Sequence, residues 1–101
     1  MSANIEAQIM PTILIVEDNA LVVQLVEQQF EDVFTIISAP NGKLGVESAR
    51  LNKPDAILMD LTMPVMDGWA AIRALRSDAS TAAIPIIALS ATREGDDISR
   101  A

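Results

Sequence analysis

The chain has 101 residues, half of them hydrophobic, which suits one small domain and leaves no room for a second core of ordinary size. Fourteen acidic residues against seven basic ones give a net charge of −7, and no cluster of Lys and Arg interrupts this acidic field, so we do not expect nucleic-acid binding. Histidine and cysteine are both absent, which excludes imidazole bases, thiol nucleophiles, disulfides and the usual zinc sites. The chemistry must therefore use carboxylates and hydroxyls, and a bound metal should be a hard cation such as Mg²⁺, Ca²⁺ or Mn²⁺.

Residues 1–11 are expected to form a loosely held N-terminal tail, because Pro11 and a polar mixture precede the first clear strand. This segment has neither the basic start nor the long apolar stretch of a signal peptide. The most apolar later run, from Ala82 to Ala91, is broken by Pro85 and is far shorter than the roughly 20 residues that span a bilayer. We therefore expect a cytoplasmic protein that does not bind membranes.

From residue 12 onward, short apolar runs that suit buried strands alternate with segments of helical spacing. The predicted strands are Ile13–Val16, the weaker candidate Thr35–Ser38, Ala56–Met59 and Ile84–Leu89. The predicted helices are one that follows the N-cap Asn19 and repeats Val22, Val26 and Phe30, one opened by Gly42 from about Lys43 to Leu51, and one from about Gly68 to Arg76. This order predicts right-handed βαβ units around a parallel sheet, with 12–101 as a single domain.

Acidic and hydroxyl residues follow three of the predicted strands. Glu17 and Asp18 come after the first strand, Asp60 ends the third, and Ser90 ends the fourth. In open parallel sheets the ligand site lies beyond the carboxyl ends of the strands, so these side chains should converge on one rim. Carboxylates brought together repel one another, and a divalent cation, best Mg²⁺, would keep them ionised. A lone aspartate beside such a cation can attack a phosphoryl group, which makes Asp60 a candidate phosphoacceptor.

These residues also have structural interpretations. Taken alone, Glu17 and Asp18 could merely end a strand and cap the next helix, and Ser90 could be an ordinary strand-end hydroxyl. Asp67 and Gly68 form a common turn pair, which we interpret as the entry to the third helix. The convergence of three strand ends favours the functional interpretation of the first group.

The stretch from Thr12 to about Ala91 resembles the receiver domain of two-component response regulators. Three segments carry the resemblance: Ile13–Asn19, which reads ILIVEDN, Asp60–Gly68, which reads DLTMPVMDG, and Ile86–Ala91, which reads IIALSA. The resemblance implies a flavodoxin-like α/β fold, with helices on both faces of a parallel sheet of strand order 2-1-3-4. It covers roughly four of the family's five strands.

The resemblance also implies a role for each residue of the acidic rim. Asp60 would accept a phosphoryl group from a histidine kinase or phosphotransfer protein, and Asp18 and Asp60 would bind Mg²⁺ with the backbone carbonyl of Thr62. Glu17 would assist through water, and Ser90 would be the switch hydroxyl that contacts the phosphoryl oxygens. The domain would be a signalling module that assists only its own phosphorylation and dephosphorylation, and not an enzyme acting on other substrates.

One departure from the family pattern keeps a second interpretation open. The family has a fifth strand that ends in a phosphate-pairing lysine, followed by a last helix, and both are expected to be missing here. Lys53 precedes the third strand, so it should lie at the opposite rim. The alternative is therefore a truncated, phosphorylation-impaired receiver that acts as a binding or dimerising module and self-associates through an exposed fourth strand. A phosphohydrolase of the haloacid dehalogenase class is disfavoured, because it needs an aspartate where this chain has Thr62.

Overall fold

A computed structural model of the protein describes residues 10–61, 63 and 66–89. Its elements in chain order are β1 (Thr12–Val16), α2 (Ala20–Phe30), β2 (Thr35–Ala39), α3 (Gly42–Asn52), β3 (Ala56–Asp60), α4 (Gly68–Arg76) and β4 (Ile86–Leu89). None of the helices in these residues has the length and apolar character needed to span a bilayer.

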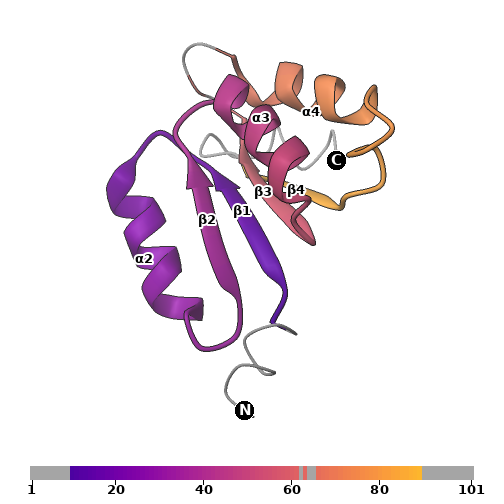
Figure 1. Ribbon diagram of the computed structural model, residues 1–101. Coiled ribbons are helices and arrows are strands. Elements are labelled where there is room, and N and C mark those ends of the chain that lie inside the picture. Colours follow the sequence, from indigo (N-terminus) through magenta and orange to yellow (C-terminus); the bar gives the residue numbers. More distant parts are fainter. Residues whose placement is uncertain (1–9, 62, 64–65, 90–101) are drawn as a thin grey trace.

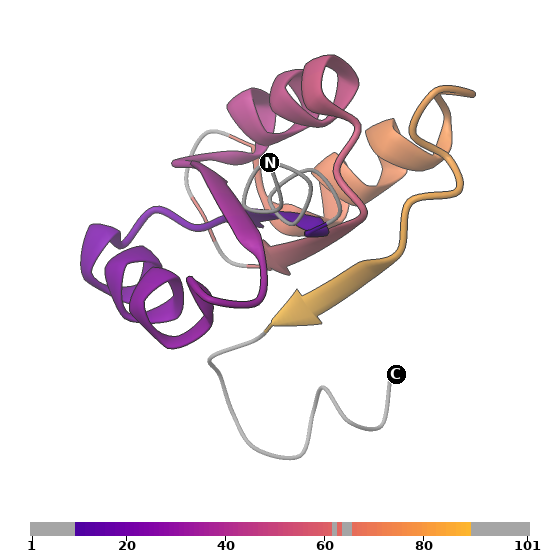
Figure 2. The same ribbon diagram turned by 60° about the horizontal axis from the view of Figure 1, so that its bottom comes forward.

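The strands form one parallel sheet with the order β2-β1-β3-β4 (Figure 1). Helices α3 and α4 lie on one side of this sheet and α2 lies on the other, beside β2 (Figure 2). The predicted flavodoxin-like arrangement and strand order are confirmed. The first residues of the chain that the structure describes are also tied to the sheet, because the carbonyl of Pro11 accepts a hydrogen bond from the N–H of Thr35 at 2.8 Å.

Each of these helices begins at an Asn or Asp that follows a strand or the loop after it. The side-chain oxygen of Asn19 accepts a hydrogen bond from the N–H of Leu21 at 2.9 Å, as predicted for the cap of α2. Asn41 caps α3 through the N–H of Leu44 at 2.9 Å, and Asp67 caps α4 at 2.8 Å. These contacts satisfy backbone donors that a helix start otherwise leaves unpaired.

The hydrophobic core lies between the sheet and the two helices α3 and α4. The buried side chains of this layer are Leu14, Val16, Ala39, Val46, Ala49, Ile57, Met59, Met63, Ala71 and Leu75. Alternate residues of the strands supply the sheet side of the core, as the two-residue period of a strand requires. Burial of each large side chain stabilises the fold by about 1.5–3 kcal/mol, so this layer holds most of the domain together.

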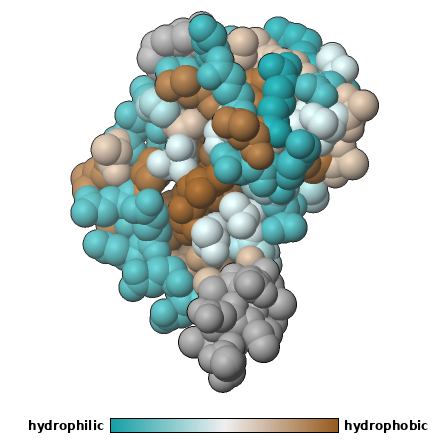
Figure 3. Space-filling model, viewed as in Figure 1, coloured by the Kyte–Doolittle hydropathy of each residue, from teal (hydrophilic) through white to brown (hydrophobic). Residues whose placement is uncertain are grey.

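The other side of the molecule leaves apolar side chains in contact with solvent. Helix α2 has no buried residue, and its Leu21 and Leu25 are 61% and 57% exposed. In β4, Ile87 and Leu89 are 53% and 40% exposed. Hydrophobic residues also gather over the strands at the centre of the face shown in Figure 3, beside the hydrophilic outer side of α2. Among the described residues β4 pairs with β3 alone, so its outer edge has no partner strand there.

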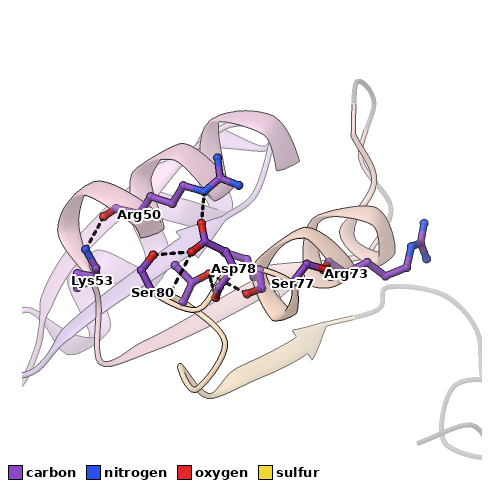
Figure 4. A network of polar contacts seen from close by, with 8 residues as sticks. Arg50, Lys53, Arg73, Ser77, Asp78 and Ser80 are labelled. Atoms are coloured by element: carbon purple, nitrogen blue, oxygen red, sulfur yellow. Dashed lines mark hydrogen bonds and ion pairs between the residues drawn. The ribbon is translucent and has the colours of Figure 1, made fainter.

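A polar network ties α3 to the end of α4 (Figure 4). The Nε of Arg50 donates to the Asp78 carboxylate at 2.7 Å, and the Nζ of Lys53 donates to the carbonyl of Arg50 at 3.0 Å. The backbone N–H and the hydroxyl of Ser80 both donate to Asp78 at 2.9 Å. These hydrogen bonds, those from Ser80 first and that from Arg50 next, hold the pKa of the Asp78 carboxyl below its ordinary value.

Candidate functional site: an acidic rim at the ends of β1 and β3

The register of the sheet brings the predicted carboxylates together. Val16 pairs with Met59 across β1 and β3, so the next residues, Glu17 and Asp60, stand side by side at the carboxyl end of the sheet. Glu17, Asp18 and Asp60 each offer one carboxylate oxygen, and these oxygens all lie within 4.8 Å of one another. Two strand ends thus supply the three acids of the site, as the topology predicts.

The three acids differ in burial. Asp60 is only 9% exposed, Glu17 is partly buried, and Asp18 is exposed. Two hydrogen bonds to the backbone of other residues hold Glu17: its carboxylate accepts the N–H of Asn19 at 3.0 Å, and its N–H donates to the carbonyl of Ala39 at 3.0 Å. The site therefore combines the buried Asp60 with the partly buried, hydrogen-bonded Glu17 and the solvent-exposed Asp18.

The negative charge of the rim affects the pKa of Glu17. Burial raises the pKa of the Glu17 carboxyl above its ordinary value, and the negative charges of Asp60 and Asp18 raise it further. The hydrogen bond from the Asn19 N–H favours the ionised form and opposes this change without cancelling it. Concentrated negative charge at partly desolvated carboxylates is the condition under which a divalent cation binds favourably.

A groove of about 440 Å³ opens beside the acids, between the start of α2 and the end of β2. Its lining residues are Glu17, Asp18, Ala20, Val23, Gln24, Glu27, Ser38, Ala39 and Pro40. Glu17 and Asp18 belong both to the acidic rim and to the groove. A molecule in the groove would therefore reach two of the three carboxylates.

The backbone after Asp60 is anchored on two sides. The N–H of Leu61 donates to the carbonyl of Leu89 at 3.0 Å, which continues the pairing of β3 with β4 by one residue. The N–H of Gly68 donates to the carbonyl of Leu61 at 3.2 Å. A Cβ on Gly68 would meet the carbonyl oxygen of Asp60 and would lie 2.6 Å from the Cα of Leu61, so only glycine fits against the acid's backbone.

The remaining residues singled out from the sequence fall into two groups. Thr62 and Ser90 lie outside the described residues, so their predicted roles stay predictions. Lys53 and Asp55 lie at the amino ends of the strands, away from the acids. Lys53 caps the end of α3, and the Asp55 carboxylate accepts the N–H of Thr12 at 2.7 Å. This location of Lys53 was predicted from its place before the third strand.

Sequence reasoning missed the contacts that shape the backbone around the site. Gly68 was interpreted only as an entry to a helix, yet it packs directly on the backbone of Asp60 and Leu61. Gly42 was interpreted only as a helix start, yet it lies against Met66 in the segment between Asp60 and α4. A glycine leaves room for close backbone approach, but a single sequence does not identify which backbone approaches it.

Comparisons with known proteins agree on one family. Residues 13–101 match the sequence model described as response regulator receiver domain. Protein PilH of Pseudomonas aeruginosa is 42% identical over 79 residues, which cover 77% of this chain and 65% of PilH. A protein-glutamate methylesterase/protein-glutamine glutaminase of Methanococcoides burtonii is 41% identical over 86 residues, which cover 81% of this chain and 24% of that protein. The chain thus spans between a quarter and two thirds of these relatives.

Solved structures with the same fold include receiver domains from bacteria and archaea. The N-terminal domain of a response regulator receiver protein from Methanoculleus marisnigri superposes with a TM-score of 0.81 at 28% identity, covering 90% of this chain and 75% of that one. The receiver domain of a sensor histidine kinase from Pseudomonas aeruginosa superposes with a TM-score of 0.80 at 34% identity, covering 88% and 74%. The latter structure has a magnesium ion coordinated in its active site cleft.

Proposed function

Because this chain belongs to the response regulator receiver domain family, whose members signal in two-component systems, we propose that it accepts a phosphoryl group on Asp60. The donor is a phosphohistidine on a histidine kinase or a phosphotransfer protein. The observation that carries the proposal is the convergence of Glu17, Asp18 and Asp60, with one oxygen of each within 4.8 Å. The chain acts in the cytoplasm as a signalling domain and assists only its own phosphorylation and dephosphorylation.

The proposed reaction is a phosphoryl transfer between two side chains. A carboxylate oxygen of Asp60 forms a bond to phosphorus while the bond from phosphorus to the donor's imidazole nitrogen breaks. The electron pair of the broken bond stays on the imidazole, and Asp60 becomes an acyl phosphate. Because Asp60 is fixed at the end of a paired strand, its carboxylate is held in place for attack.

The three acids fit a magnesium ion. Mg²⁺ favours hard oxygen ligands and usually takes one or two carboxylates with waters and phosphate oxygens, which suits this donor set. We propose that Asp18 and Asp60 bind it directly together with the backbone carbonyl of Thr62, and that Glu17 contacts it through water. When bound, the ion neutralises the negative charge that otherwise keeps a phosphoryl group away from the carboxylates.

Ser90 completes the proposed site. Its hydroxyl donates a hydrogen bond to the phosphoryl oxygens and thereby reports the modification to the end of β4. This role rests on the position of Ser90 directly after Leu89, the last residue of β4.

A second function is favoured by the exposed apolar side chains of β4. Ile87 and Leu89 point into solvent on a strand whose outer edge has no partner among the described residues, and such edges pair with other chains. We propose self-association through β4, which would also suit a receiver that acts as a binding module without phosphorylation. Light scattering at rising concentration should show a dimer that Ile87→Lys removes. Leu51→Lys, a change at an 81% exposed leucine of α3, should leave it intact, and a stable monomer at high concentration would contradict this proposal.

The phosphoryl-acceptance proposal is tested by intact-mass analysis after incubation with Mg²⁺ and acetyl phosphate. Here acetate is the leaving group, and one phosphoryl group should add to the wild-type chain and none to Asp60→Asn. A matched control is Asp55→Asn, the same chemical change at the opposite end of β3, which should be phosphorylated normally. Absence of the added group in wild type would refute the proposal, as would equal modification of Asp60→Asn.

A further inference from the structure

Two of the residues between Asp60 and α4, Leu61 and Met66, each lie against a glycine. At one end Gly68 lies on the backbone of Asp60 and Leu61, where an added Cβ would be 2.6 Å from the Cα of Leu61. At the other side Met66 lies on Gly42, the first residue of α3, where an added Cβ would meet the Met66 carbonyl oxygen and would lie 3.0 Å from both the carbonyl carbon and the Cβ of Met66. Contacts this short force one partner to move, because the atoms they involve are mostly backbone.

Helix α3 is not the partner that can move easily. Its first turn is fixed by the Asn41 cap, and its buried Val46 and Ala49 belong to the core. Gly45 packs against the side chain of Val16, the last residue of β1. A displacement of α3 would disturb all of these contacts, so a side chain at position 42 would displace Met66 instead.

We propose that Gly42 is a positioning residue for the acidic rim. Without a side chain, Gly42 leaves room for the backbone of Met66, and the position of Met66 in turn influences the affinity of the carboxylates for the cation and the rate of phosphoryl transfer. The proposal rests on the proposed function of Asp60. It assigns no contact with substrate to Gly42, which acts through Met66.

The chain offers a matched control on the same helix. Gly45 is buried like Gly42 and lies one turn further along α3, but a Cβ there would meet the Cγ2 and Cγ1 atoms of Val16 at 2.7 and 2.9 Å. Gly45→Ala therefore crowds the methyl groups of Val16, whose backbone stays paired with β2 and β3 on both sides, while Gly42→Ala crowds the backbone of Met66. Both variants should unfold at a lower urea concentration than wild type, and only Gly42→Ala should change the acidic rim.

The first measurement uses the NMR amide resonances of the metal-free protein. They are recorded without urea, at a pH where both variants are folded. Gly42→Ala should shift the N–H signals of Leu61, Met66 and Gly68, whereas Gly45→Ala should leave those three signals near their wild-type positions. Unchanged signals in Gly42→Ala would overturn the proposal whether or not the protein binds a cation.

The second measurement is a Mg²⁺ titration followed by the fluorescence of Trp69, the single tryptophan, which is half exposed in the first turn of α4. Changes in groups that orient metal ligands lower affinity by about 10- to 100-fold, so we expect the Kd of Gly42→Ala to rise about tenfold and that of Gly45→Ala to stay within twofold of wild type. Equal losses in the two variants would overturn the positioning role. Failure of wild type itself to bind Mg²⁺ would instead refute the proposed function, and with it any role of Gly42 toward the cation.

Discussion

Replacing Asp60 by Asn should stabilise the protein when no divalent cation is present. The substitution keeps the size of the side chain but removes one of the three charges that meet within 4.8 Å. Two unit charges at that distance repel by about 0.9 kcal/mol in water and by about 3.5 kcal/mol at an effective dielectric constant of 20. Because Glu17 is only partly buried and Asp18 is exposed, the lower part of this range applies, and we expect a gain of about 1 kcal/mol in the free energy of unfolding.

Urea unfolding with and without Mg²⁺ tests this expectation. In a chelator, Asp60→Asn should have the higher midpoint, while Mg²⁺ at 100 times its Kd should stabilise wild type by about 2.7 kcal/mol and the variant by much less. The order of the two proteins would then reverse on addition of the cation. Asp55→Asn, which lies at the other end of β3, should show no reversal. A variant that is less stable than wild type in chelator, or equal stabilisation of both by Mg²⁺, would refute the electrostatic account of the site.

Other predictions concern pH and the contacts that hold the end of α4. Because burial and neighbouring charge raise the pKa of Glu17 in the folded state, the metal-free protein should lose stability as pH rises from about 4.5 through the raised pKa, and Glu17→Gln should flatten that slope in urea titrations at several pH values. The buried hydroxyl of Thr81 donates to the carbonyl of Leu75 at 2.7 Å, so Thr81→Val should lower the free energy of unfolding by about 1–3 kcal/mol, measured by urea denaturation. A double-mutant cycle on Arg50 and Asp78 should show a small favourable coupling at low salt that disappears at high salt, and a salt-independent coupling would argue against an exposed ion pair.

The secondary structure was largely predictable because most of its determinants are local. The Asn19 cap and the bounds of α4 were predicted from single residues and spacing, and even the weaker candidate for β2 is a strand. The fourth apolar run was predicted from Ile84, but the strand begins at Ile86. Two features occupy the stretch before it: the side chain of Arg76 donates to the carbonyls of Ala82 and Ile84 at 2.7 and 2.9 Å, and Pro85 has no N–H to donate to a neighbouring strand.

The meeting of the three acids was predictable from the sequence, but the contacts that support them were not. Strand direction alone placed Glu17, Asp18 and Asp60 on one rim, since a parallel sheet brings all carboxyl ends to the same edge. The contact of Gly42 with Met66 joins two segments that are 24 positions apart in the chain, and no local pattern encodes it. The same holds for the Lys53 cap of α3, where a lysine adopts a left-handed φ of 45° that sequence propensity assigns to glycine or asparagine.

The acidic rim depends on the core through the register of β1 and β3. Val16 and Met59 are fully buried, and their backbones are paired. This pairing places the next residues, Glu17 and Asp60, side by side at the carboxyl end of the sheet. Side chains alternate between the faces of a strand, so a slip of β3 by one residue would turn Met59 out of the core and turn the Asp60 carboxylate into it. The slipped pairing would bury an ionised group among apolar side chains and expose a methionine, and both changes are unfavourable. The buried residues that precede the acids therefore keep Asp60 and Glu17 level with each other, and that alignment places their carboxylates within reach of one cation.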